Sequence, residues 1–333
     1  MDQENILFGM EDDSQATPEI PLYEELNPDF EDVNGGLKTN NPKGNRWQRR
    51  FVHVADKESK FRKTVETVLV VHGWKTPAKT DPMTLVILSV SLDCHARDFR
   101  FQSVRMWLAF DEDRRVEPPN TEEAAPEVIA YAPFVAPQSW NTSDEEIEKT
   151  SDMGTTAGAE YFAKADVEWK KGVKRSFTRS HFDRGSADWM VDDDQRTYGV
   201  NWYCEQNELQ KFGVKPQFHI AVLLKRQHTK AGKPISFRGI FDMRTEAGFI
   251  HDFNEKRGRV FRLGKPEDEA IYYHPDMDDQ IYGLNNTGEA LRSKIDKENL
   301  GKLIGGPDGS WLSALIDPTG NLFGLEPMKP KIG

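Results

Sequence analysis

FHIAVLLKR at Phe218–Arg226 and ISFRGIFDM at Ile235–Met243 are two short runs rich in aliphatic, aromatic and β-branched residues. The turn-forming sequence AGKP at Ala231–Pro234 lies between them. The second run carries Ile, Phe, Gly, Phe and Met at alternate positions, which is the side-chain period of a strand with one buried face. Two such runs joined by a loop that contains Gly are typical of a β-hairpin, and we expect one here.

Other strand-like runs precede this pair along the chain. They are Thr67–Trp74 (TVLVVHGW), Met83–Leu92 (MTLVILSVSL), Phe99–Phe110 (FRFQSVRMWLAF) and Glu127–Tyr131 (EVIAY). The second and third of these are predicted to form another hairpin around the polar turn Asp93–Asp98. With the alternating segment described below, the chain offers about eight strands and no alternating long helices. This pattern favours a mainly β protein, an antiparallel β-sandwich or barrel.

Helical spacing of apolar residues is confined to the C-terminal part of the chain. Gly288–Leu303 keeps this spacing and is followed by the helix-terminating sequence GGP at 305–307. A second, short helix is predicted at Ser310–Ile316. We therefore expect a C-terminal helical appendage on the β body.

Charge divides the chain into segments. Residues 1–37 contain eleven acidic side chains and no Lys or Arg, a composition that predicts a mostly disordered acidic tail. Residues 38–63 form a basic collar with nine basic and two acidic residues. We predict a β-sandwich body over residues 64–253 and a C-terminal extension with one or two helices over residues 254–333.

Motifs for catalysis or metal binding are missing from the sequence. Cys94 and Cys204 are too few for a disulfide scaffold or a four-cysteine zinc site, and the eight His residues do not fall at ligand spacing. No HExxH, GxSxG or phosphate-loop motif occurs. We expect no cofactor and no metal, and a non-enzymatic role is favoured. A carbohydrate-active hydrolase stays as an alternative, with a carboxylate pair that the sequence does not identify.

The expected location is the cytoplasm. The N-terminus lacks the cationic start and apolar run of a signal peptide. The longest apolar runs, such as Thr84–Val90, are far shorter than the roughly 20 residues of a membrane-spanning helix, so we expect no integral membrane segment. The basic collar carries Trp47 and Phe51, as a nucleic-acid arm would, but the neutral body offers no wider positive field. Nucleic-acid binding is therefore not favoured.

An alternating segment runs from Gly154 to Gly185, and its amphipathic part at 159–177 is the sharpest functional signal. Apolar residues occupy odd positions from 159 to 169, with Tyr161, Val167 and Trp169 as the candidate amphipathic face. Pore-forming β proteins span membranes with stretches of about ten such residues. A strand that covers a sandwich core gives the same alternation. The cations in and after this segment form a candidate interaction surface that could receive the acidic tail: Lys164, Lys170, Lys174, Arg175 and Arg179.

Three motifs resemble a known group of proteins. They are VEW at Val167–Trp169, VNWYCEQN at Val200–Asn207 and AVLLKR at Ala221–Arg226. In this order, after a glycine-rich lead-in, they resemble uncharacterised β-rich proteins of filamentous fungi, over roughly Thr67–Met243. The resemblance implies an intracellular fungal β protein and supplies no catalytic residues.

The leading hypothesis is a non-enzymatic cytosolic β-sandwich protein that acts through protein-protein contacts or self-association. In this hypothesis the acidic tail is a regulatory or autoinhibitory arm, and the partner is another protein or a second copy. The alternative is a membrane-active, pore-forming-like β protein that uses residues 159–177 and makes peripheral contact with a membrane.

Overall fold

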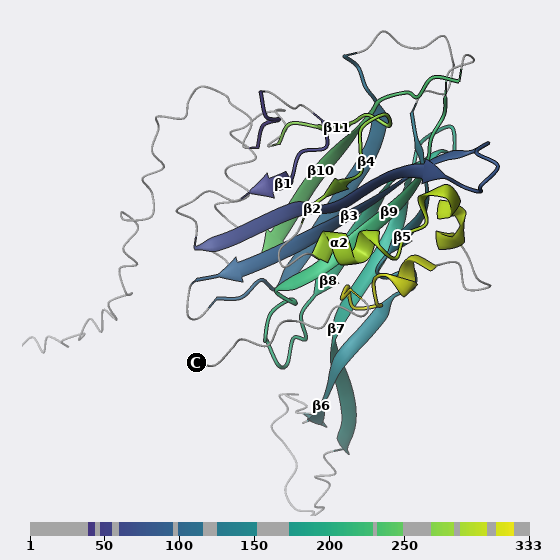
Figure 1. Ribbon diagram of the computed structural model, residues 1–333. Coiled ribbons are helices and arrows are strands. Elements are labelled where there is room, and N and C mark those ends of the chain that lie inside the picture. The colour runs from purple at the N-terminus through teal and green to yellow at the C-terminus, as the bar shows by residue number, and fades with distance from the viewer. Residues whose placement is uncertain are drawn as a thin grey trace, which may run out of the picture. The chain divides into compact units, whose positions relative to one another are not determined.

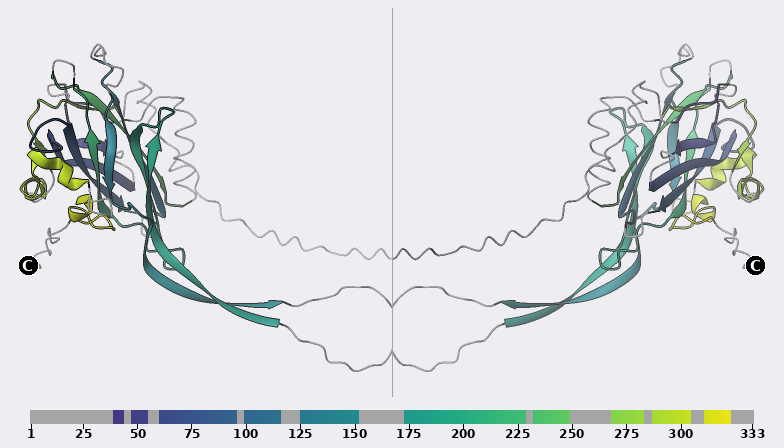
Figure 2. Two further views of the ribbon diagram at one scale, coloured as in Figure 1. Left: turned by 90° about the vertical axis from the view of Figure 1, so that its right-hand side faces the viewer. Right: turned by 90° about the vertical axis from the view of Figure 1, so that its left-hand side faces the viewer.

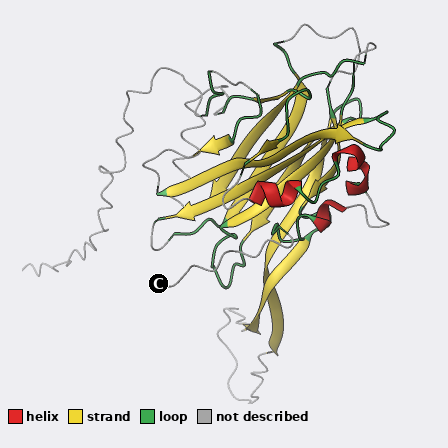
Figure 3. Ribbon diagram, viewed as in Figure 1, coloured by secondary structure: helices red, strands yellow, loops and turns green. Residues whose placement is uncertain are grey.

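The computed structural model describes residues 39–43, 47–54, 60–95, 99–115, 125–151, 173–228, 232–248, 268–282, 287–304 and 311–322 (Figures 1 and 3). All of them belong to one compact unit, Leu37–Gly333. The acidic tail at 1–37 lies outside the described residues, as do Tyr161, Lys164, Val167, Trp169 and Lys170. Predictions that concern these residues remain predictions.

Two antiparallel sheets form the body. The first sheet contains, in spatial order, β1 (Phe51–Val54), β2 (Phe61–Trp74), β3 (Pro82–Cys94), β9 (Gln217–Lys225) and β5 (Glu127–Ala132), with β12 (Gln280–Ile281) also paired to β2. The second sheet contains β11 (Ile271–Tyr273), β10 (Phe237–Glu246), β4 (Ser103–Glu112), β8 (Thr197–Glu205), β7 (Val173–Val191) and β6 (Gln138–Ser151). The sheets pack face to face, which confirms the predicted β-sandwich (Figure 2).

The main core lies between the two sheets. Val86 and Leu88 of β3 face Met106 and Leu108 of β4, and Trp202 of β8 is fully buried in the same cluster. In β4 the residues alternate between buried and more exposed positions. This alternation follows from a strand that has the core on one side only.

A second core covers the outer face of the first sheet. It joins Leu85 and Ile87 of β3 to Leu291 and Leu300 from the C-terminal elements α2 (Thr287–Arg292), η3 (Lys297–Leu303) and η4 (Trp311–Ala314). Strands β3 and β9 are thus buried on both faces. This double burial explains why their sequences are continuous apolar runs rather than alternating ones.

The predicted long helix at Gly288–Leu303 is wrong in one respect. The structure divides it into α2 and η3, with a non-helical residue, Asn299, inside the second. Asp296 caps η3 by accepting a hydrogen bond from the backbone N–H of Glu298, which starts a new helical turn at this point. The appendage itself is confirmed, as a set of short helices.

Both predicted hairpins are wrong. β9 pairs with β3 and β5 in the first sheet, whereas β10 pairs with β4 and β11 in the second. β3 and β4 likewise belong to different sheets. The loops after β3 and β9 therefore cross from one sheet to the other. Turn-forming residues mark where the chain reverses, but they do not specify which sheet the next strand joins.

One cation of the predicted basic collar is part of the fold. Arg49 is buried, and its guanidinium donates hydrogen bonds to the carbonyl oxygens of Phe51, Val52 and Glu269. Burial lowers the pKa of Arg49, although the nearby Asp268 opposes this shift. The side chain fixes β1 to the segment before β11, so this charge is not available to a partner.

Candidate functional site

Strands β6 and β7 run out of the sandwich as a two-stranded ribbon. At Arg184 and Gly185, β7 pairs with both β6 and β8, and from Ser186 to Val191 it pairs with β8 alone within the described chain. Residues Val173–His181 of β7 pair only with Ser143–Ser151 of β6 within the described chain, and Figure 2 shows this pair projecting from the body. We call these two segments the ribbon. A two-stranded sheet alone is marginally stable in water, so the ribbon depends on the contacts at its base.

A β-bulge marks the base of the ribbon. Trp140 lies opposite Asp183 and Ser143 lies opposite His181, so β6 has one more residue than β7 between these pairs. Asn141, one of the extra pair, has a φ of +50°. Asn is among the few residues other than Gly that adopt this conformation readily. Bulges bend a strand, and this one lies where the ribbon leaves the second sheet.

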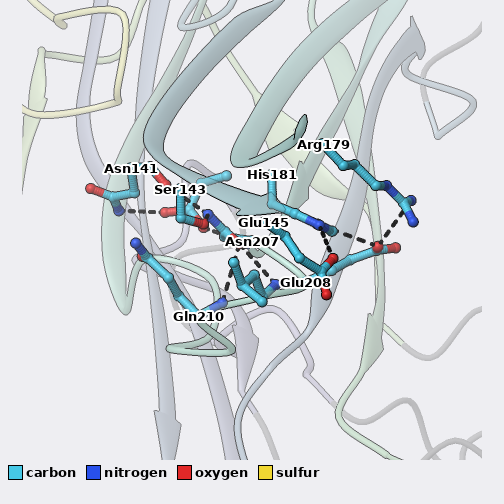
Figure 4. A network of polar contacts seen from close by, with 10 residues as sticks. Asn141, Ser143, Glu145, Arg179, His181, Asn207, Glu208 and Gln210 are labelled. Atoms are coloured by element: carbon cyan, nitrogen blue, oxygen red, sulfur yellow. Dashed lines mark hydrogen bonds and ion pairs between the residues drawn. The ribbon is translucent and has the colours of Figure 1, made fainter. Parts of the chain in front are cut away.

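A buried polar network, the neck, joins the ribbon to the loop after β8 (Figure 4). Asp183 accepts hydrogen bonds from Asn141 Nδ2, at 2.5 Å, and from the backbone N–H of Asn207, at 2.6 Å. Nδ2 of Asn207 donates to the carbonyl oxygen of Asn141 and to Ser143 Oγ, at 2.7 and 2.9 Å. Its Oδ1 accepts from the backbone N–H of Leu209 at 2.9 Å. The side chain of Asn207 therefore joins β6 to the loop, and its backbone N–H joins the loop to β7.

Charged side chains continue the neck toward the ribbon. His181 lies between two carboxylates, with Nε2 3.2 Å from Glu145 and Nδ1 3.8 Å from Glu208. Arg179 also reaches Glu208, at 3.7 Å. The His181 side chain is only 8% exposed, whereas that of Glu208 is 67% exposed. Pairs as exposed as Arg179 and Glu208 contribute at most about 1 kcal/mol, so the buried amide of Asn207 is the stronger element of the neck.

Aromatic packing supports the neck from the sandwich side. The rings of Phe134 and Trp140 stack with their centroids 5.9 Å apart. Phe134 also lies against Gly185 of β7, where an added Cβ would stand 2.4 Å from the ring. A side chain at position 185 would displace Phe134, so the close approach of β7 requires glycine here.

Exposed apolar side chains occur in β7 and in the loop after β8, which the neck joins. Phe182 of β7 is 40% exposed, and in the loop after β8 Leu209 is 42% and Phe212 is 76% exposed. Single exposed apolar residues are common on protein surfaces. These three side chains, in β7 and in the loop that contacts it, are exposed apolar groups that the two cores do not bury.

The predicted surface residues lie partly in the ribbon. Lys174 and Arg175 occupy positions in β7 opposite Thr150 and Lys149, and Arg179 contacts Glu208. Sequence reasoning missed β6 altogether, because QSWNTSDEEIEKTS has few strand-forming residues. A signal was present, however. The acidic run in β6 is opposite in net charge to β7, and the register places Glu145 opposite Arg179, a favourable cross-strand pair.

The described residues offer little for metal or hydrolytic chemistry. No group of three or more His, Cys, Asp or Glu residues suited to a metal ion occurs among them. Against the effect of burial, hydrogen bonds from Arg238 and Arg115 hold the pKa values of Asp111 and Asp113 below the ordinary value. Each resolved carboxyl shift in the described chain is downward. A glycosidase acid needs a raised pKa, so none of these groups fits that role.

In the part of the chain that the structure describes, no helix is long and apolar enough to cross a bilayer.

No protein-family model matches this chain, and neither does any curated protein. One solved structure that it matches is the crystal structure of the Clostridium perfringens NetB toxin in the membrane inserted form. The match has 8% sequence identity and a TM-score of 0.21, and it covers 69% of this chain and 92% of the toxin chain. These values do not establish a common fold.

Proposed function

We propose that this protein is a membrane-active β protein and that the ribbon, with the segment it carries, is the element that meets the bilayer. The observation that supports this is the pairing of Val173–His181 with Ser143–Ser151 alone, beyond the last residue of β8 that pairs with β7. A strand that served only to complete the second sheet is not expected to extend past its neighbour β8.

The sequence carried by the ribbon suits a bilayer. From Ala159 to Trp169 the odd positions are apolar, and Glu160, Lys164, Asp166 and Glu168 occupy even positions. A membrane β-strand requires about 9–11 residues that alternate between a lipid face and a water face. Residues 159–169 have this length and this alternation, with Phe162 as the one apolar residue at an even position.

Membrane action and self-association are compatible in this proposal. Within hydrocarbon each backbone N–H and C=O must be hydrogen-bonded, and an isolated hairpin leaves both of its edges open. Self-association, which the sequence suggested as the leading hypothesis, is therefore required if the protein acts on a membrane. Cytosolic location stays a prediction, since a protein can reach a membrane from either side. The fungal resemblance also stays a prediction.

The test is leakage of a trapped dye from vesicles of phosphatidylcholine and phosphatidylserine. The double variant Val167→Asp/Trp169→Asp is expected to lose at least about tenfold in leakage rate, because charged groups destabilise a lipid-facing strand, by about 2–4 kcal/mol for Arg or Lys at the bilayer midplane and by less for each Asp. The matched control is Val135→Asp/Val191→Asp, at exposed body positions, which should leak like the wild type. Leakage that persists in the first variant would refute the proposal.

The acidic tail is proposed to restrain association. It carries the whole net charge of −11. In this proposal it binds to the positively charged residues of β7. A chain that begins at Lys38 is therefore expected to form larger species than the full chain at low salt, as measured by size exclusion with light scattering. The difference should shrink as salt shortens the Debye length below about 8 Å. Identical monomers from both chains at low salt would rule out a restraining tail.

A further inference from the structure

We propose that the ribbon pairs with the ribbon of a second copy of this chain, head to tail, so that β6 of one copy lies beside β7 of the next. This inference rests on the proposed function, because it names the partner that the ribbon requires. It is carried by two features of the described strands: their free edges and their opposite charges.

Each ribbon strand has one edge without a neighbouring strand in the described part of the chain. On the N-terminal side of Arg184, the described residues of β7 pair with no strand other than β6, and β6 is the last strand of the second sheet. Such an edge presents a row of backbone donors and acceptors that can pair with another chain. The loop after β8 contacts β7 through the side chains of Arg179, His181 and Asp183, and no further strand of the described chain pairs with these backbone edges.

Charge differs in sign between the two edges. Ser143–Ser151 contains four acidic residues and one Lys, a net charge of −3, and Val173–His181 contains three cations and no acid, a net charge of +3. Within one copy the net charges of the two strands are therefore opposite, and the register places Glu145 opposite Arg179, although it also places Lys149 opposite Arg175. Between copies, contact of β6 with β6 or of β7 with β7 would oppose like charges, which destabilises cross-strand pairs. Only β6 beside β7 keeps the match.

Head-to-tail pairing has a consequence for assembly. A contact that joins two different surfaces can repeat from copy to copy, and it closes into a ring when the rotation between copies allows. Closure would pair every open edge of the ribbons. Each copy would then have a strand partner on both sides, as a bilayer requires of its backbone.

A charge-exchanged variant tests the direction of pairing. Its substitutions are Glu146→Lys, Glu148→Lys, Lys174→Glu and Arg175→Glu, which lie outside the neck contacts. Because both strands change sign together, they remain complementary within a copy, and the variant is expected to assemble with itself. Wild type and variant should not mix, since β6 of either would face a like-charged β7 of the other.

Mixing is measured by co-purification of untagged protein with tagged wild type, from solution and from phosphatidylcholine and phosphatidylserine vesicles dissolved in mild detergent. We expect tagged wild type to recover the charge-exchanged variant at least about tenfold less than it recovers untagged wild type. The neutralised control, Glu146→Gln/Lys174→Gln, should be recovered like wild type. Free mixing of wild type with the charge-exchanged variant, or monomers throughout, would overturn head-to-tail pairing.

Dye leakage in the same samples separates this inference from the proposed function. Segregated assemblies that cause no leakage would support the pairing and refute membrane action. Leakage by a protein that stays monomeric would support membrane action and refute the pairing.

Discussion

Replacing Asn207 by Ala is expected to free the ribbon from the body. The side chain is 1% exposed, and its amide makes hydrogen bonds to Asn141, Ser143, Leu209 and Gln210. Alanine would leave buried donors and acceptors without partners, and each such group costs about 1–3 kcal/mol. Some of this cost is recovered when water enters, so we expect a local loss of about 2–4 kcal/mol.

Hydrogen exchange is the measurement that detects this loss, because local opening need not change global unfolding. Amides of Ser143–Ile147 and Thr178–Asp183 should exchange at least about tenfold faster in the Asn207→Ala variant, while those of β3 and β9 should not change. The control is Ser180→Ala, which removes an exposed hydrogen bond to Asp144 on the other side of the ribbon. Unchanged exchange in the ribbon would show that Asn207 does not hold it.

The variant Asn207→Asp separates the donor from the acceptor role of this side chain. It keeps an oxygen for the backbone N–H groups of Leu209 and Gln210, but it loses both donations to β6. It also places a carboxylate beside the buried Asp183. If the hydrogen bonds that Asn207 donates to β6 hold the ribbon, the ribbon amides should exchange as fast in this variant as in Asn207→Ala. In the proposed function, both should start dye leakage earlier than the wild type does.

The fold class could be predicted because burial determines local residue patterns. β4 alternates since one face meets the core, and β3 is continuously apolar since both faces do. Strand partners could not be predicted in the same way. The loops after β3 and β9 carry ordinary turn residues, and whether the chain folds back or crosses to the other sheet depends on contacts distant in sequence.

The candidate site was predicted only in part. The alternation and the cations at 174–179 pointed to β7, but β6 and the neck went unseen. Asn141, Asp183 and Asn207 are distant in sequence and individually ordinary, and only the bulge and the end of β8 bring them together. Buried amide networks of this kind leave no period or motif in a sequence. Charge complementarity between two runs was the only available sign of their pairing.

Acid is expected to weaken a different part of the molecule, where His219 of β9 meets the C-terminal segment. The backbone N–H of His219 donates to the carbonyl oxygen of Gly320 at 2.7 Å, and Lys215 holds the same segment through the carbonyl oxygen of Thr319. Burial lowers the pKa of His219 from 6.5 to about 4, the Gly320 carbonyl opposes this shift, and Lys215 adds to it. The folded protein therefore keeps this imidazole neutral at pH 5.

The sign of the pH dependence follows from the lowered pKa. Above pH 6.5 neither state binds a proton at His219, so its contribution to stability is fully present. Between 6.5 and about 4 the unfolded chain binds a proton that the folded chain does not, and the free energy of unfolding falls. This single group should cost about 2 kcal/mol at pH 5. His72, whose pKa is lowered first by burial and then by Arg226, acts in the same direction.

Urea unfolding at pH 7.5 and pH 5 distinguishes His219 from other groups. His219→Gln removes the titrating group and keeps a side-chain donor, so the variant should lose about 2 kcal/mol less than the wild type on acidification. His95→Gln, at a position where the side chain is 47% exposed, should behave like the wild type. Equal losses in wild type and His219→Gln would contradict the assignment. Because His219 lies in the first sheet and the neck in the second, acid should loosen the C-terminal segment, whereas Asn207 variants loosen the ribbon.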